Sequence, residues 1–169
     1  LTNLKILSPK KGLLCKLVTY CPLEYAEQIR SALFNAGAGD IGNYNGCSFN
    51  SQGEGTYKGN ELSNPFIGEK GERHTEKEIR LETIFEKQKQ TAVLKALFES
   101  HPYEEVAYDV YSLENSYNNV GSGMIGELVE IQTETEFLQK VKIAMKAGCL
   151  RHTALIGRVI NEICYCSVS

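Results

Sequence analysis

The chain has 169 residues, of which 42% are hydrophobic and 23% charged, proportions typical of a soluble globular protein rather than a disordered one. Its formal net charge of -3 and isoelectric point near 5.7 argue against a binding surface for nucleic acid or for an anionic membrane. No apolar run approaches the roughly 20 residues that a membrane-spanning helix needs. We therefore expect a protein with its own hydrophobic core, no nucleic-acid partner and no membrane partner.

The chain contains six cysteines, too few for its length to resemble a secreted disulfide scaffold, and we expect a reduced, cytoplasmic protein. On a strand, Cys164 and Cys166 would present both thiols on one face. A structural zinc site needs four ligands, usually including a C-x₂₋₄-C pair, so we interpret these two thiols as buried, small apolar side chains. The first residue is Leu1 rather than Met, and we expect a piece of a longer protein.

The first predicted elements are a strand and a helix. β-Branched and aromatic residues at 15–21 predict a strand, which a proline ends. Residues 22–37 follow the helical period, with glutamates near the start and Gly37 suited to a left-handed cap. Residues 39–59 are rich in glycine and carry scattered aromatic residues, which predicts twisted or bulged strands with tight turns. Residues 60–73 have the composition of a loop.

A strand, a helix and a further strand follow. Residues 74–86 alternate charged and apolar side chains, which predicts a strand with one face in water. The next helix, starting at residue 87, should end near Ser100 because Pro102 disfavours helical geometry at the residue before it. Residues 104–113 predict the last strand of this region. The side chains expected to face inward are Ile79, Leu81 and Ile84, then Val93, Leu94, Leu97 and Phe98, then Val106, Tyr108 and Val110.

The order strand, helix, strand, strand, helix, strand is that of the ferredoxin-like, or split βαβ, arrangement. We therefore predict an α+β fold in which one antiparallel sheet carries two helices on one face. The candidate edge of this sheet is the run 42–58, which has only Glu54 and Lys58 as charges.

The stretch "HPYEEVAYDVY" at residues 101–111 contains the residue types of an acid–base site. Adjacent residues of a strand point to opposite faces, so Glu104 and Glu105 should not converge on one substrate. We interpret the stretch as the end of a helix and the start of a strand. No catalytic residue is predicted in this chain.

After residue 113 the pattern changes. Residues 114–123 are polar and turn-rich, which indicates a boundary. A strand over 124–131 should lead into a helix over 133–148 that Thr133 and Glu136 open as a capping box and Gly148 closes, followed by strands over 151–157 and 159–168. The apolar stripe of the helix comprises Phe137, Leu138, Val141, Ala144 and Met145. So short a segment buries too little surface alone and indicates half of an α/β domain.

Five motifs in order resemble the long bacterial members of the NGG-one-interacting-factor-three-like family, also labelled GTP cyclohydrolase type-two homologues. They are "GAGDIGNYNGCSFNSQGEGTYKG", "NPFIGE", "EIRLETI", "HPYEEVAYDVY" and "GSGMIGEL". "HPYE" before the last strand also resembles the CutA divalent-ion-tolerance proteins, which are similar to the nitrogen-regulatory PII fold.

The resemblance implies a hydrolase-like protein whose α/β core holds a pair of divalent metal ions (zinc, iron or manganese) and carries a PII/CutA-like insertion. Residues 1–13 would connect from a missing first core half, 14–113 would be the insertion, and 114–169 would begin the second half. The family implies self-association, with the insertions meeting in threes as trimers or hexamers.

The family's metal ligands would lie outside this chain, so no metal ligand and no cofactor are expected within it. The histidines His74, His101 and His152 match no family ligand position and are interpreted as surface or capping residues. The family usually has a Cys-Gly-Gly turn after its last strand here, whereas this chain has "CYCSVS", without the glycines that such a turn uses.

Three functions are compatible with these patterns. The 14–113 region could be a trimeric lid or regulatory domain without an active site, a sensor of a small molecule or metal, or a protein-interaction module. Small-molecule sites of PII-type trimers lie in clefts between subunits, and the glycine-rich segment would be the responsive loop. It lacks the G-x-x-x-x-G-K-[ST] pattern of a phosphate loop. The residues assigned to a ligand site are Asn43, Tyr44, Cys47, Ser48, His101, Tyr103 and Glu104.

Overall fold

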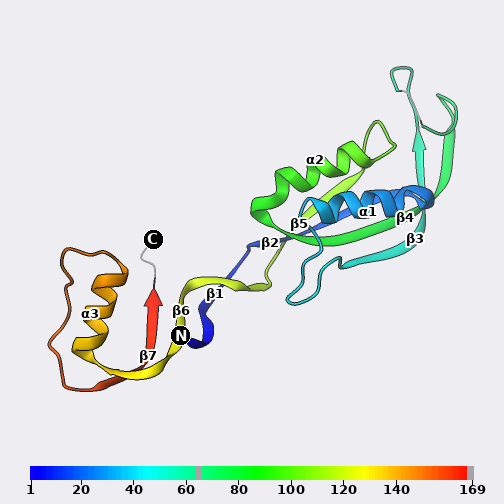
Figure 1. Cartoon of the computed structure of the whole chain (residues 1–169). Helices are drawn as coiled ribbons and strands as arrows, with labels where there is room; N and C mark the ends of the chain where they lie inside the picture. Colours follow the sequence, from blue (N-terminus) through cyan, green and yellow to red (C-terminus); the bar gives the residue numbers. More distant parts are fainter. Residues whose placement is uncertain (64–65, 167–169) are drawn as a thin grey trace. The chain divides into compact units, whose positions relative to one another are not determined.

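The computed structural model describes residues 1–63 and 66–166 and shows an α+β protein with two sheets and three α-helices (Figure 1). The chain divides into two compact units: unit 1 comprises Leu1–Lys10 and the residues from Asn118 onward, and unit 2 comprises Lys11–Tyr117. In the described ranges, no helix has both the length and the apolar character needed to span a bilayer.

Unit 2 contains a four-stranded sheet in the order β3-β4-β2-β5, with every neighbouring pair antiparallel. Two α-helices lie together on one face of this sheet (Figure 1). In chain order the elements are β2 (Leu14–Pro22), α1 (Ala26–Asn35), β3 (Ser48–Lys58), β4 (Arg73–Glu86), α2 (Gln90–Ser100) and β5 (Tyr108–Leu113).

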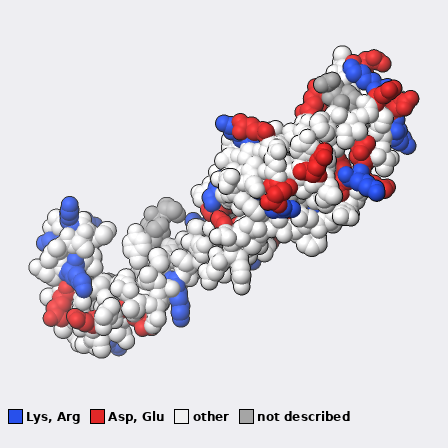
Figure 2. Space-filling model, turned by 45° about the vertical axis from the view of Figure 1, so that its right-hand side comes forward, with Lys and Arg blue, Asp and Glu red and all other residues white. Residues whose placement is uncertain are grey.

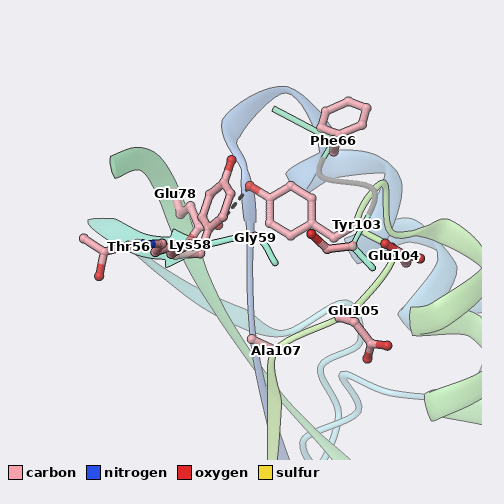
Figure 3. A pocket seen from close by; sticks show the side chains of 12 residues that line it. Thr56, Lys58, Gly59, Phe66, Glu78, Tyr103, Glu104, Glu105 and Ala107 are labelled. Carbon is pink, nitrogen blue, oxygen red and sulfur yellow. Dashed lines mark hydrogen bonds between the residues drawn. The ribbon is translucent and has the colours of Figure 1, made fainter. Parts of the chain in front are cut away.

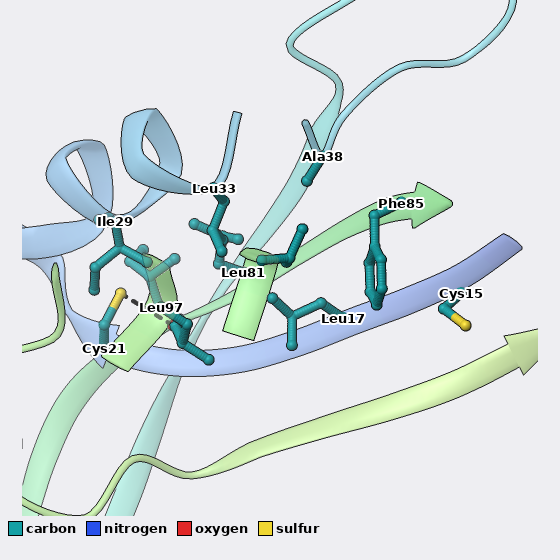
Figure 4. Close-up of a cluster of buried hydrophobic side chains, with 12 residues drawn as sticks. Cys15, Leu17, Cys21, Ile29, Leu33, Ala38, Leu81, Phe85 and Leu97 are labelled. Atoms are coloured by element: carbon teal, nitrogen blue, oxygen red, sulfur yellow. Dashed lines mark hydrogen bonds between the residues drawn. The ribbon is translucent and has the colours of Figure 1, made fainter. Parts of the chain in front are cut away.

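The core of unit 2 lies between these helices and the sheet (Figure 4). Alternate residues of the strands point toward the helices, and both helices contribute an apolar stripe at helical spacing. The cluster of buried residues comprises Cys15, Leu17, Cys21, Ala26, Ile29, Leu33, Ala38, Ile79, Leu81, Phe85, Val93 and Leu97.

Three of the residues expected to face inward are not part of the buried core: Ile84, Phe98 and Tyr108, of which Tyr108 is 39% exposed. Ile79, Leu81 and Phe85 share the buried face of β4, and Ile84 therefore lies on the opposite face. Phe98 is 48% exposed on α2 and packs edge-on against Tyr108 at 5.4 Å between ring centroids. At these positions the packing of neighbouring elements, rather than the hydrophobicity of the residue, decides whether the side chain is buried.

The glycine-rich segment forms a turn followed by one regular strand rather than bulged strands. Gly39, Gly42 and Gly46 adopt positive φ before β3 begins. From Ser48 onward β3 pairs with β4 without a register shift, up to Lys58 opposite Arg73. As predicted, this segment lies at the edge of the sheet.

The last strand of unit 2 starts later than predicted. Helix α2 ends at Ser100, as the proline predicts, but β5 begins only at Tyr108, so Glu104 and Glu105 lie before the strand. The carbonyl oxygen of Tyr20 accepts a 2.9 Å hydrogen bond from the His101 ring, and the Thr19 hydroxyl donates to the Ala107 carbonyl. These side-chain contacts replace the ladder that would otherwise extend β5.

Unit 1 contains the sheet β1-β6-β7 and helix α3. Its elements are β1 (Thr2–Lys11), β6 (Ser116–Thr133), α3 (Glu134–Ala144) and β7 (Val159–Cys166). The predicted capping box of Thr133 and Glu136 is present. Residues 1–13, expected to be a connecting segment, thus include a strand, and β6 extends through the turn-rich residues 116–123.

Two further predictions for unit 1 are wrong. Residues 151–157 form no strand, because the Glu134 carboxylate accepts hydrogen bonds from the backbone N–H groups of Ile156 and Gly157 and so fixes this segment as a loop. Helix α3 ends four residues before Gly148, and the left-handed residue after it is Lys146, with a φ of 50°. The residues after Cys166, where the family usually has a glycine turn that this sequence lacks, and the first two residues of "NPFIGE" lie outside the described residues.

Candidate functional site

A cavity of about 280 Å³ opens in unit 2 where the end of β3, the middle of β4 and the segment before β5 meet (Figure 3). Such a volume is at the lower end of the range of roughly 300–1,000 Å³ typical of small-molecule sites. Its lining comprises Gly55, Thr56, Tyr57, Lys58, Gly59, Ser63, Phe66, Glu78, Tyr103, Glu104, Glu105 and Ala107.

A hydrogen bond joins two sides of this cavity. The Tyr103 hydroxyl donates to Oε1 of Glu78 at 3.0 Å, shown as the dashed line in Figure 3. Burial raises the pKa of the Tyr103 hydroxyl, and the adjacent Glu78 carboxylate raises it further, so Tyr103 stays protonated and acts as a donor. Gly55 makes room for Glu78, since a Cβ at this position would lie 2.1 Å from Oε2 of the glutamate.

A row of rings brings together two of the sequence motifs. Phe66, from "NPFIGE", packs edge-on against Tyr25 at 5.7 Å and lies 6.1 Å from the ring of Tyr103, from "HPYE". The Tyr103 ring in turn meets the His101 ring edge-on at 5.0 Å. Aromatic pairs at such separations attract each other beyond the effect of buried area alone. The two motifs therefore form a common wall of the cavity.

His101 supports this wall instead of facing the cavity as a base. It is only 8% exposed; Nδ1 accepts from the Tyr103 backbone N–H at 3.1 Å, and Nε2 lies 2.9 Å from the Tyr20 carbonyl oxygen. An acceptor at Nδ1 requires the proton to be on Nε2, so the ring is the neutral Nε2–H tautomer. Burial lowers the pKa of His101, against weaker opposing effects of the Tyr20 carbonyl and of Glu78.

The third aromatic side chain of the lining is fixed by the loop that follows β3. The Tyr57 hydroxyl donates to the Ile67 carbonyl oxygen at 2.6 Å, and its ring lies beside His74 at 5.7 Å. Burial is the first cause of the raised pKa of Tyr57, followed by the charges of Glu76 and Glu78.

The structure divides the predicted ligand residues into two groups. Tyr103 and Glu104 line the cavity, and His101 lies behind it. The other group, Asn43, Tyr44, Cys47 and Ser48, belongs to the turn before β3. Ser48 pairs with Thr83, five residues along β4 from Glu78, and at about 3.3 Å per residue this separates the groups by roughly 17 Å.

The predicted ligand residues in the turn before β3 have structural contacts of their own. The Thr83 hydroxyl donates to the Cys47 carbonyl at 2.9 Å, and the Cys47 N–H bonds to the Gly39 carbonyl at 2.8 Å. Tyr44 is 76% exposed. Sequence reasoning missed Tyr57, Phe66, Glu78 and Glu105 as cavity residues, although all four lie within motifs that had been singled out.

The described residues do not bring together metal ligands. No group of three or more His, Cys, Asp or Glu side chains among them could hold a metal ion. Acidic and basic side chains alternate over the face seen in Figure 2.

Comparison with known proteins gives consistent relatives. The chain is 47% identical over 148 residues to the GTP cyclohydrolase 1 type 2 homolog of Bacillus subtilis (strain 168), which covers 88% of this chain and 40% of the relative. It is 45% identical over 164 residues to the protein of the same name from Halalkalibacterium halodurans, covering 96% and 44%. No family model matches the chain.

A solved structure agrees with these relatives. The Bacillus cereus protein related to NIF3 superimposes with a TM-score of 0.74 at 37% identity, over 97% of this chain and 43% of that one. The chain therefore spans less than half the length of the proteins it matches. Sequence and structure together confirm the resemblance predicted from the motifs, and the chain belongs to the NIF3-related family of GTP cyclohydrolase 1 type 2 homologues.

Proposed function

We propose that unit 2 is a regulatory domain that binds a small molecule within a longer protein of this family. The cavity between β3, β4 and the "HPYE" segment is the observation that carries the proposal. It combines aromatic walls with a few polar groups, the usual composition of a small-molecule site. His101 and the Tyr103–Glu78 hydrogen bond hold its walls in place.

The proposed domain is ferredoxin-like, of the PII/CutA type. The support is its sheet order: counted within unit 2, the second, third, first and fourth strands lie side by side, and both helices cover one face. Residues 14–113 would form this insertion and residues 114–169 part of the second core half. We place the protein in the cytoplasm, without nucleic-acid or membrane partners.

The full-length protein is proposed to be hydrolase-like and to hold a pair of zinc, iron or manganese ions in its core. The described residues of this chain do not fit such a pair, because no three potential ligands lie close enough together. We therefore assign no chemical step to this chain and place the metal ligands in other parts of the protein.

A second candidate function is that of a trimeric lid, favoured by the edge strand β3. This strand carries Phe49, 66% exposed, and the preceding turn carries Tyr44, 76% exposed. An unpaired sheet edge with exposed aromatic residues favours association with other copies. Trimers or hexamers would be compatible with ligand binding, so the two candidates are not exclusive.

Hydrogen exchange followed by mass spectrometry tests the ligand-binding proposal. A panel of nucleotides, amino acids, amines and divalent cations should contain a compound that slows exchange at 55–59 and 103–107. Peptides from α3 serve as an internal control and should be unaffected. Unchanged exchange at both cavity segments across the panel would contradict the proposal. Protection confined to residues 43–48 would instead place the ligand at the turn before β3.

A further inference from the structure

The charge of the cavity lining distinguishes between classes of ligand. Three acidic residues, Glu78, Glu104 and Glu105, belong to the cavity lining, and Lys58 is the one basic residue among the described lining residues. Opposite charges at contact distance in a partly buried site attract with several times the energy found in bulk water. The lining therefore favours a cation over an anion.

The aromatic walls favour an organic cation rather than a bare metal ion. Tyr57, Phe66 and Tyr103 contribute rings to the lining. Both phenol hydroxyls are already engaged, with the Ile67 carbonyl and with Glu78, so these side chains offer their rings to a ligand. The faces of aromatic rings attract ammonium groups, most strongly where water is excluded. The described acidic residues of the lining do not converge into a group of three or more ligands that could hold a metal ion.

The Glu78 carboxylate provides an anchor for a positively charged group. Oε1 accepts from Tyr103, and Oε2 lies where a Cβ of residue 55 would be if that residue were not glycine. Gly55 thus lets the carboxylate occupy the space beside β3, at the cavity wall. One oxygen is fixed by a neutral donor, so the carboxylate keeps its full negative charge for a second donor.

The same lining disfavours a phosphorylated ligand. Phosphate sites in proteins use arginine pairs, helix N-termini or runs of backbone N–H groups. Arginine is absent from the described lining, and the Glu78 carboxylate would repel a phosphate. The small volume of about 280 Å³ also restricts the ligand to a compact molecule.

We propose, resting on the ligand-binding function above, that the cavity of unit 2 binds a small organic ammonium compound. Its ammonium group lies at the Glu78 carboxylate and its apolar part lies between Phe66, Tyr57 and Tyr103. The ligand class is a primary ammonium compound with a compact apolar or aromatic body.

A titration with isosteric probes tests this assignment on the whole chain. Phenethylammonium, neutral 2-phenylethanol, anionic phenylacetate and ATP are added separately, and amide shifts are followed by ¹H–¹⁵N NMR. We expect phenethylammonium to shift the amides of 55–59 and 103–107 at a concentration about tenfold lower than 2-phenylethanol, because a charged contact is worth more than a neutral one. Phenylacetate and ATP should leave these amides unchanged.

Variants locate the charge that is recognised. Glu78→Gln keeps an acceptor for Tyr103 but removes the charge. It should weaken the binding of phenethylammonium about tenfold and leave the binding of 2-phenylethanol unchanged. Glu105→Gln is the second variant. It leaves the hydrogen bond between Tyr103 and Glu78 intact and should weaken the binding of the cation severalfold. Glu99→Gln, on the outer surface of α2, is the matched control and should have no effect.

The outcomes separate the two proposals. Shifts of the amides of 55–59 and 103–107 with ATP or phenylacetate, and none with phenethylammonium, would overturn the ammonium assignment. The proposal that the cavity binds a ligand would then still hold. Equal affinities for the cation and for 2-phenylethanol, with no effect of either glutamine variant, would do the same. No shift at the cavity with any probe, together with a negative hydrogen-exchange panel, would overturn both.

Discussion

The Tyr103 hydroxyl donates a 3.0 Å hydrogen bond to the Glu78 carboxylate, although 25 residues separate the two in sequence. The bond ties the segment after α2 to the middle of β4 and places a phenol and a carboxylate on facing walls of one cavity. A fixed pair of this kind is a stronger indication of a site than either residue alone, because each orients the other.

Alanine substitutions at two glycines of β3 test whether the Glu78 carboxylate needs the space beside the strand. Gly55→Ala should lower the free energy of unfolding by about 1 kcal/mol, because the added Cβ displaces the carboxylate from Tyr103. Gly53→Ala, in the same strand, meets nothing within 4 Å and should be neutral or stabilising by up to about 1 kcal/mol. Urea unfolding of both variants measures the difference. Equal effects would show that Gly55 has no special role.

His101 should make stability depend on pH on the acidic side. Its pKa is lowered in the folded chain from 6.5 by burial, so the unfolded chain binds the proton more tightly. The contribution is fully present above about pH 6.5 and is lost as pH falls through the lower, folded value. Urea unfolding between pH 7.5 and 5 should show this decline.

The matched variant for this prediction is His101→Gln. It should be less stable than the native chain at pH 7.5 but lose less stability on acidification, because the buried titrating group is gone. A direct NMR titration of the His101 ring should give a midpoint below 6.5. Parallel stability curves for the two chains would show that another group causes the decline.

The cysteines should fall into two classes of reactivity. Cys15 and Cys21 are 1% and 0% exposed, and burial raises the pKa of the Cys21 thiol to about 11, which removes the reactive thiolate. Cys149, Cys164 and Cys166 are exposed. A thiol reagent at pH 8 should therefore modify Cys149 and Cys166 rapidly, Cys164 more slowly because its hydrogen bond with Cys166 raises the pKa of its thiol, and the buried pair only after unfolding. The exposure of Cys164 and Cys166 corrects the expectation that both are buried.

Peptide mapping of the modified chain reads out each cysteine separately. Cys149→Ser should remove one rapidly reacting thiol, whereas Cys21→Val should remove none. Rapid labelling of Cys21 in the folded chain would contradict the burial described here.

Assembly through the β3 edge should be visible in solution. Light scattering after size exclusion should give roughly three or six times the chain mass of 18.8 kDa. Phe49→Glu places a charge on the exposed edge and should shift the mass toward the monomer. Leu62→Glu, in the loop after β3 and 93% exposed, is the control and should keep the assembly. A native monomer at tens of micromolar would reject the trimeric lid.

The sequence by itself determined the order of elements in unit 2 and several of their ends. These features depend on local chemistry: Pro102 excludes helical geometry at His101, and Thr133 with Glu136 satisfies the first N–H groups of α3. Alternation of polar and apolar residues identified β4, and a sparsely charged glycine-rich run identified the sheet edge. The two-residue period of a strand could not show whether Ile84 or Phe85 faces the core, because adjacent residues point to opposite faces and both are apolar.

Only the tertiary structure determines which residues form the cavity. Phe66, Glu78 and Tyr103 come from different segments and meet only because β3, β4 and β2 pair in one register. Glu104 and Glu105 lie in the segment before β5 rather than in the strand, because the His101 ring donates to the Tyr20 carbonyl and the strand starts only at Tyr108. Long-range contacts of this kind leave no periodic trace in the sequence, since each depends on a partner tens of residues away.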